Sequence, residues 1–143
     1  MGTVEGITLV KDSTGAFERV EAVRAEAGEG LHGDYHSDLT LIAAEALEGL
    51  REETGIELAG HETRRNVLTR GIDLNALVGR RFTVGDVEAV GVELAEPCTK
   101  LRRLSGEPGV LRGLVHRGGL RAEVVQGGQI AVGDAVSAQD EAR

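Results

Sequence analysis

A single cysteine is the residue with the clearest chemical potential in this sequence. Cys98 directly follows Pro97, which would end the predicted strand before it, because proline cannot donate a hydrogen bond to a strand ladder. Lys100, Arg102 and Arg103 come next, and neighbouring cations favour the thiolate form of a cysteine. A thiolate can act as a nucleophile, carry sulfur or bind a soft metal. The alternative interpretation is an inert, half-buried thiol.

A second polar group is the run Arg64-Arg65-Asn66, at the start of a strand predicted over residues 63–69. Alternation along this strand would place Arg64 and Asn66 on one face and Arg65 on the other. Two guanidinium groups and an amide suit an oxyanion such as a phosphate, or the polar edge of a heterocycle. The alternative is a solvated strand face whose arginines pair with nearby acids.

Other constellations are less informative. His32 and His36 flank Asp34 in a glycine-rich loop, but a loop does not bring two such imidazoles to one helical face, so a two-histidine metal site is disfavoured. The sequence contains neither a phosphate-binding Gly-x-x-x-x-Gly-Lys pattern nor a Gly-x-Ser-x-Gly pattern. Hydrolysis of nucleotides and serine-based hydrolysis are therefore unsupported.

Composition narrows the class of protein further. The chain has 143 residues, the length of one domain, and a net charge of −8 with three aromatic residues, which argues against nucleic-acid binding. Residues 63–121 nevertheless carry 11 Lys/Arg and 6 Asp/Glu, as expected around a small anionic ligand, although an uneven surface would give the same balance. Because neither a signal peptide nor an apolar run of membrane-spanning length is visible, a cytoplasmic protein is expected.

The elements that must position these residues are mostly short strands. An amphipathic helix is predicted from Asp38 to Thr54, although residues 39–42 could form a short strand instead. Its apolar stripe should be buried, namely Leu39, Ile42, Ala46, Leu47 and Leu50. Further strands are predicted over residues 3–11, 17–27, 81–84, 87–94, 120–126 and 135–138, and a helical turn over residues 73–78.

A repeated Val-Gly-Asp, at residues 84–86 and 132–134, is typical of tight turns between strands of one curved sheet. Many short strands, 21 glycines and few helices predict a mainly β fold, a single-domain β-barrel over residues 1–143 with helical decoration.

Seven segments in this order resemble the MOSC domain, named after the C-terminal domain of molybdenum cofactor sulfurase. They are Gly33-Asp34-Tyr35-His36, residues 41–47, Arg64-Arg65-Asn66-Val67, residues 71–79, Val84-Gly85-Asp86, Pro97-Cys98 and residues 127–134. The resemblance spans residues 5–136, and the position of Pro-Cys after the Asn and Asp-Leu segments is its most telling part.

The resemblance implies a strand-rich barrel that binds the molybdenum cofactor, a pterin with a dithiolene and a phosphate. It implies that Cys98 carries sulfur as a persulfide or ligates molybdenum, with Arg65 and Asn66 as cofactor-binding residues. Weaker candidates for the same site are Arg64, Thr99, Lys100 and Arg121. Pyridoxal phosphate is associated with the family only through a separate sulfurase domain, so no site for it is expected in this chain.

Three functions follow as hypotheses. The first is a cofactor-binding or sulfur-carrying protein that uses Cys98. The second is a molybdenum-dependent reductase of N-hydroxylated compounds. The extra domains that reductase members carry are not expected in a chain of this length. This favours a carrier or a subunit that is served by a sulfur-donating or electron-donating protein. The third is a non-catalytic module that binds an anionic metabolite.

Overall fold

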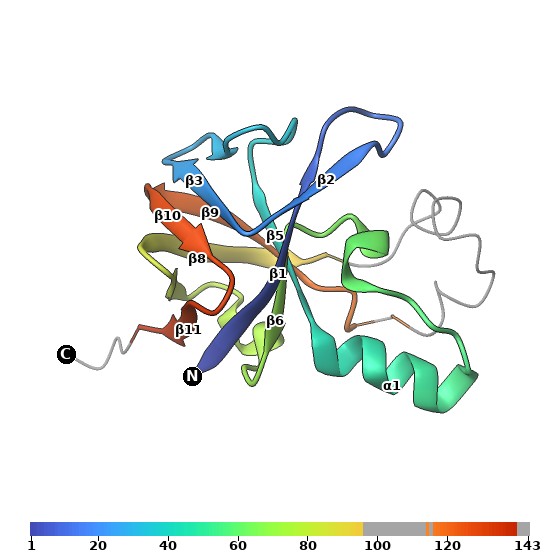
Figure 1. Ribbon diagram of the computed structural model, residues 1–143. Helices are drawn as coiled ribbons and strands as arrows, with labels where there is room; N and C mark the ends of the chain where they lie inside the picture. Colours follow the sequence, from blue (N-terminus) through green and yellow to red (C-terminus); the bar gives the residue numbers. More distant parts are fainter. Residues whose placement is uncertain (96–113, 115, 140–143) are drawn as a thin grey trace.

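The computed structural model describes residues 1–95, 114 and 116–139, and its main feature is a closed barrel (Figure 1). Seven strands form the ring in the order β11-β7-β8-β9-β5-β6-β1, and β1 pairs back with β11 through Gly2 and Val136. The pairing of β5 with β6 is parallel, whereas the other neighbours in the ring are antiparallel. The predicted mainly β barrel with helical decoration is confirmed.

The strands are β1 (Gly2–Val10), β2 (Phe17–Val20), β3 (Ala22–Glu26), β4 (Gly30–Leu31), β5 (Leu39–Ala43), β6 (Val67–Arg70), β7 (Arg81–Val84), β8 (Val87–Leu94), β9 (Leu120–Gln126), β10 (Gly128–Ala131) and β11 (Ala135–Ala138). The helical elements of the described residues are α1 (Ala44–Thr54) and two 3-10 turns, η1 (Gly60–Thr63) and η2 (Leu74–Leu77). None of these helices is long and apolar enough to cross a membrane.

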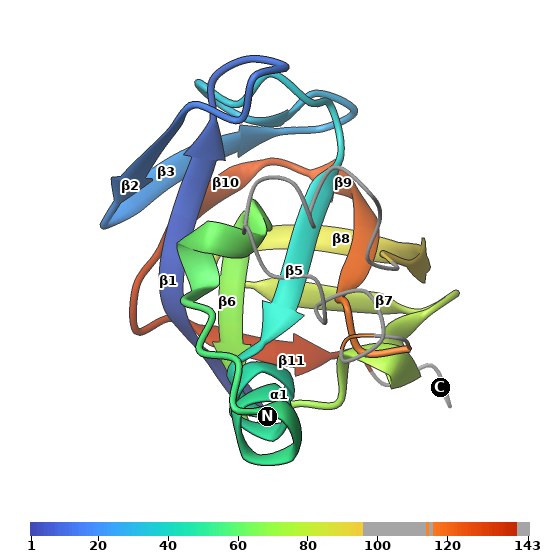
Figure 2. The ribbon, with the colours of Figure 1, turned by 90° about the vertical axis from the view of Figure 1, so that its right-hand side faces the viewer.

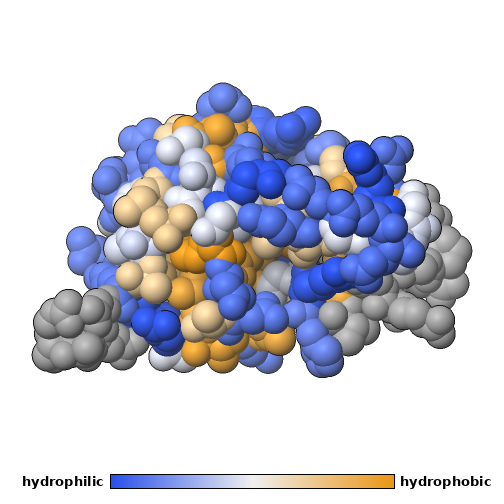
Figure 3. All heavy atoms as spheres, turned by 90° about the horizontal axis from the view of Figure 1, so that it is seen from below, coloured by the Kyte–Doolittle hydropathy of each residue, from blue (hydrophilic) through white to orange (hydrophobic). Residues whose placement is uncertain are grey.

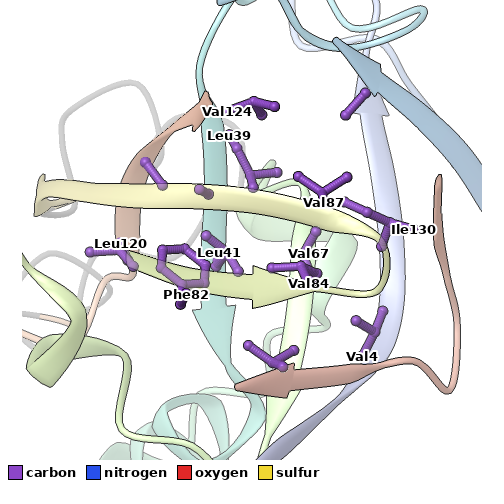
Figure 4. Packing of buried hydrophobic residues seen from close by; sticks show 14 of the residues in the cluster. Val4, Leu39, Leu41, Val67, Phe82, Val84, Val87, Leu120, Val124 and Ile130 are labelled. Carbon is purple, nitrogen blue, oxygen red and sulfur yellow. The ribbon is translucent and has the colours of Figure 1, made fainter. Parts of the chain in front are cut away.

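Aliphatic side chains from the barrel strands fill its interior (Figure 4). The burial pattern of β8 shows the reason, because alternate residues from Val87 onward point inward and are buried. Phe82 is the one aromatic residue of this core, and Leu41, Val67 and Leu120 pack in the same cluster. Branched aliphatic side chains therefore fill the space that aromatic side chains occupy in many protein cores.

The helix predicted from Asp38 to Thr54 is wrong in its first part. Residues 39–43 form strand β5, which confirms the alternative of a short strand over residues 39–42, and α1 begins only at Ala44. Leu39 and Ile42 are buried as predicted, but by lying between β6 and β9 in the barrel wall rather than on a helix face. A run of four apolar or β-branched residues fits a central strand as well as a helix, so periodicity alone does not decide between them.

Two further strand predictions need correction. The strand predicted over residues 17–27 is two strands. The first, β2, pairs with β1, whereas the second, β3, pairs with β10 in a separate sheet of order β10-β3-β4. The strand predicted over residues 63–69 begins only at Val67, after η1 and a left-handed residue at Arg64. By contrast, β7, β8, β9 and β11 coincide with their predicted ranges.

The repeated Val-Gly-Asp is a turn motif in both places, but only the first copy joins strands of one sheet, as predicted. Gly85 and Gly133 both have positive φ. Gly85 lies between β7 and β8, which pair antiparallel, whereas Gly133 connects β10 of the three-stranded sheet to β11 of the barrel. Asp134 accepts a hydrogen bond from the backbone N–H of Ala131 at 2.9 Å, so this aspartate stabilises its own turn.

On the side where α1 lies, Figure 3 shows apolar surface in the middle of the face with hydrophilic residues around it.

Candidate site at the β5–β6–β9 edge

Asn66 lies at the centre of a buried polar network that joins β1, β5 and the loop that precedes β5. Figure 2 shows β6 between β1 and β5 on this side of the barrel. The Asn66 side chain is almost fully buried, at 2% exposure for the residue. The amide oxygen accepts from the backbone N–H and the hydroxyl of Thr40, both at 3.1 Å. The amide nitrogen donates to the carbonyl of Thr8 and to Oδ1 of Asp34, both at 3.0 Å. Asn66 therefore joins three segments that are distant in sequence.

Asp34 is the acidic member of this network, and its side chain is fully buried. Its Oδ1 also accepts from the backbone N–H of Val10 at 2.6 Å, and its Oδ2 accepts from the N–H of His36 at 3.1 Å. Nδ1 of the His36 ring lies 3.5 Å from Oδ2. A buried carboxylate needs such donors to offset its lost hydration, so Asp34 fixes the glycine-rich loop against β1.

Arg65 connects the two chain segments that flank residues 96–117. Its Nε donates to the carbonyl of Gly118 at 2.8 Å, and its Nη2 donates to the carbonyl of Ala95 at 2.9 Å. Ala95 also donates its backbone N–H to Gly119 at 2.8 Å. One guanidinium can reach both carbonyls because its donors form a planar fork. Arg65 thus holds the end of β8 and the start of β9 together.

Replacing Arg65 by alanine should loosen this connection. We expect a loss of about 2 kcal/mol in the free energy of unfolding, since two charge-assisted hydrogen bonds are removed. Exchange of the Ala95 amide hydrogen, measured by mass spectrometry or NMR, should become at least about tenfold faster. Arg64→Ala is the matched control, because it removes an adjacent guanidinium that bonds elsewhere. Unchanged exchange at Ala95 in the Arg65 variant would contradict this role.

Arg64 points to a different part of the molecule from Arg65. It adopts a left-handed conformation with φ of 61°, and its guanidinium donates to the carbonyls of Gly15 and His61 at 2.7 and 3.1 Å. Its charged group also lies 4.4 Å from the ring centre of Phe17. The structure therefore separates Arg64 from Arg65, but through a turn at the end of η1 and not through strand alternation.

Arg121 stands on β9, directly opposite Thr40 of β5. Its guanidinium forms ion pairs with Glu93 at the end of β8 and with Asp38, whose carboxylate lies 3.5 Å away. The hydrogen bond to Glu93 is the main cause that raises the pKa of Arg121. Arg121 therefore lies on the same edge of the barrel as Asn66, to which Thr40 is bonded, while Arg65 bonds to the neighbouring strand ends.

A family model described as the MOSC domain matches residues 28–137, which is more than half of the chain. The chain belongs to the MOSC domain family. It is thus a molybdenum-cofactor-related domain, as the seven ordered sequence segments predicted. Among the curated proteins, none matches this chain.

Solved structures show the same fold at low sequence identity. The YuaD protein from Bacillus subtilis superposes with a TM-score of 0.84 at 15% identity, over 96% of this chain and 96% of that one. YiiM from Geobacillus stearothermophilus gives a TM-score of 0.77 at 14% identity, over 98% and 76% of the two chains. YiiM from Escherichia coli gives 0.72 at 15% identity, over 97% and 70%. The MOSC barrel therefore persists across very different sequences.

Three of the predicted site residues, Cys98, Thr99 and Lys100, lie outside the described residues of this MOSC domain. The described residues contain no group of three or more His, Cys, Asp or Glu side chains arranged to hold a metal ion. His32 and His36 do not converge on one site, because His32 pairs with Glu26 and His36 with Asp34. The roles of Cys98, Thr99 and Lys100 remain predictions.

Sequence reasoning gave Asp34 and Thr40 too small a part in this MOSC domain. In the sequence, Asp34 stands out only as the acid between His32 and His36, and Thr40 is one residue of an otherwise apolar run. Both are direct partners of Asn66. The sequence feature that could have indicated the role of Asp34 is an acidic residue in a glycine-rich loop. Such a residue often fixes its loop by accepting hydrogen bonds from the backbone.

Proposed function

We propose that this MOSC protein binds the molybdenum cofactor or carries sulfur for it, with Cys98 as the reactive thiol. The observation that supports this is the contact of Arg65 with the carbonyl of Ala95, three positions before Cys98 in the sequence. Arg65 is adjacent to Asn66, so residues singled out independently by motif and by charge belong to one edge of the barrel. Along the sequence, Cys98 is followed by Lys100, Arg102 and Arg103, and neighbouring cations favour the thiolate form.

The cofactor combines a pterin ring, a dithiolene and a phosphate, and the described residues fit this group in two respects. Arg65 provides positive charge at this edge, because its bonds to Gly118 and Ala95 are to neutral carbonyls, whereas Arg121 is neutralised by Asp38 and Glu93. A cavity of about 440 Å³ lies next to Gly119, which is large enough for a bicyclic ring. When bound, the cofactor would supply the redox-active metal, while Cys98 would supply a soft sulfur ligand.

In the sulfur-carrier form of this proposal, Cys98 receives sulfur from a persulfide on a donor protein. The Cys98 thiolate attacks the outer sulfur of the donor persulfide, a new S–S bond forms at Cys98, and the donor leaves as its thiolate. No external oxidant is needed, because the transferred sulfur atom is already at the sulfane oxidation state in the donor persulfide and keeps that state. A sulfur-donating protein is therefore the partner that this chemistry requires. An electron donor would be required instead if Cys98 ligates molybdenum in a reductase.

Replacing Cys98 by serine tests the proposal. Protein purified from a molybdenum-replete host should contain molybdenum or cyanide-reactive sulfane sulfur, and Cys98→Ser should lose nearly all of it. A serine hydroxyl stays protonated and is a hard ligand, so it supports neither a persulfide nor a soft-metal bond. Thr99→Ser is the matched control and should retain the wild-type content. Equal content in wild type and Cys98→Ser would contradict the proposal and leave a binding module for an anionic metabolite.

A further inference from the structure

Residues 116–119 lead into β9, and each of them is held by a different part of the molecule. The carbonyl of His116 accepts from the side chain of Asn75 in η2 at 2.7 Å. Arg117 bonds to a carboxylate of α1, and the carbonyls of the two following glycines accept from Arg65 and from the backbone at the end of β8. His116 has a φ of 63°, a left-handed conformation that a residue other than glycine keeps only where its surroundings fix it.

The contact of Arg117 with α1 is built into the sequence of the helix. Its guanidinium donates to both carboxylate oxygens of Glu53, at 2.9 and 3.0 Å. Gly49 lies one helical turn before Glu53, and a Cβ added at Gly49 would lie 2.8 Å from Nη1 of Arg117. A side chain at position 49 would therefore displace the guanidinium. Glycine is a poor helix former, so this contact gives its place inside α1 a structural reason.

Leu114 attaches the start of the same turn to α1. Its side chain is fully buried in a cluster that contains Leu47 and Leu50 of the helix. The backbone N–H of Arg117 donates to the carbonyl of Leu114 at 3.0 Å, so a turn joins the two contacts. An exposed ion pair alone stabilises little, but here a bidentate pair and a buried leucine hold one turn against the helix. Because α1 follows directly on β5, the helix itself has a fixed place on the barrel (Figure 2).

We propose that Arg117 is a positioning residue, which couples α1 to the candidate site through the next residue of the chain. That residue is Gly118, whose carbonyl accepts from Nε of Arg65 at 2.8 Å. Nη2 of Arg65 holds the carbonyl of Ala95, three positions before Cys98 in the sequence. The coupling from α1 to Ala95 stands on these contacts alone, whereas its consequence for sulfur or molybdenum rests on the proposed function.

Gly49→Ala tests the coupling without weakening the helix. Alanine is a better helix former than glycine, so thermal unfolding should occur at the wild-type temperature or above it. The added methyl group should move the guanidinium of Arg117 away from Glu53, and exchange of the Ala95 amide hydrogen should become about fivefold faster. In the Arg117→Gln background, Gly49→Ala should accelerate this exchange no further. A contact that only supported α1 would leave the exchange at Ala95 unchanged.

Glu53→Gln and Glu52→Gln form a matched pair on the same helix. Both remove one negative charge from α1, but Glu52 is exposed and forms no ion pair within the described part of the chain. Glu53→Gln should accelerate exchange at Ala95 as Gly49→Ala does, whereas Glu52→Gln should match wild type. In protein purified from a molybdenum-replete host, the content of molybdenum or sulfane sulfur should be at least about threefold lower in Glu53→Gln than in Glu52→Gln.

Unchanged exchange at Ala95 in either Gly49→Ala or Glu53→Gln would overturn the inference, whatever the Cys98→Ser test shows. Faster exchange in both variants, together with equal molybdenum and sulfur in wild type and Cys98→Ser, would retain the coupling and refute only the proposed function. If Cys98→Ser loses its molybdenum or sulfur but Glu53→Gln keeps the wild-type content, the positioning role of Arg117 is wrong.

Discussion

Replacing Asn66 by aspartate should lower the free energy of unfolding by about 3–5 kcal/mol at neutral pH, since it places an unpaired charge in a buried site. The substitution keeps one oxygen for the two donors of Thr40. It exchanges the amide nitrogen for a second oxygen, which then faces the carbonyl of Thr8 and the carboxylate of Asp34 at about 3 Å. Two acceptors then meet where a donor and an acceptor met before, which is unfavourable when both are buried.

Urea or thermal unfolding measures this effect, and a second substitution tests its cause. The double variant Asp34→Asn with Asn66→Asp leaves one negative charge, now at position 66, and restores a donor between the two side chains, at the cost of the acceptor for the N–H of Val10. It should recover at least about 1 kcal/mol of the loss, as expected for coupled neighbours in one network. Unchanged stability in Asn66→Asp, or no recovery in the double variant, would show that the hydrogen bond between Asp34 and Asn66 contributes little.

Gly119→Ala should destabilise the barrel by a comparable amount, about 3–5 kcal/mol. Gly119 has a φ of +120°, which side chains of L-residues rarely adopt. A Cβ at this position would also lie 2.2 Å from the carbonyl oxygen of Leu41, which belongs to the adjacent strand and cannot move freely. The substitution would therefore push β9 away from β5 at the point where Arg65 contacts Gly118.

Gly133→Ala separates the backbone effect from the clash. Gly133 also has a positive φ, of 95°, but a Cβ there would meet nothing within 4 Å. It should cost about 1–2 kcal/mol, which is the strain of the backbone conformation alone. Equal losses in unfolding free energy for the two variants would show that contact with Leu41 is relieved by a small shift of the chain.

Much of the barrel could be predicted from local patterns. In β7 the alternation of outward and buried residues matches the alternation of polar and apolar residue types, so the strand and its bounds follow from the sequence. In residues 39–43 the pattern fails, because a strand buried on both faces has no polar face to reveal its period. The helix that follows shares the same apolar composition, so the boundary at Ala44 leaves no local signal.

The contacts of Arg65 and Asn66 could not be predicted from the sequence. Both residues are conspicuous as types, yet the partners described above lie 26 to 58 positions away, at Thr40, Ala95, Asp34, Gly118 and Thr8. Such partners are determined by barrel closure and not by the neighbouring sequence. The side chains of Arg64 and Arg65 point to different parts of the molecule because Arg64 has a left-handed backbone conformation. An arginine in the sequence does not predict that conformation.

The pairing of Gly2 with Val136 also has a consequence for how this chain is made. A ribosome releases β1 well before β11, so β1 exists without one of its neighbours while all the strands between them are made. Closure of the ring must wait for β11, and such long-range pairing makes folding slow. During this interval the open edge of β1 is available for pairing with other extended chains. The barrel therefore gains its protection from aggregation only after β11 has been synthesised.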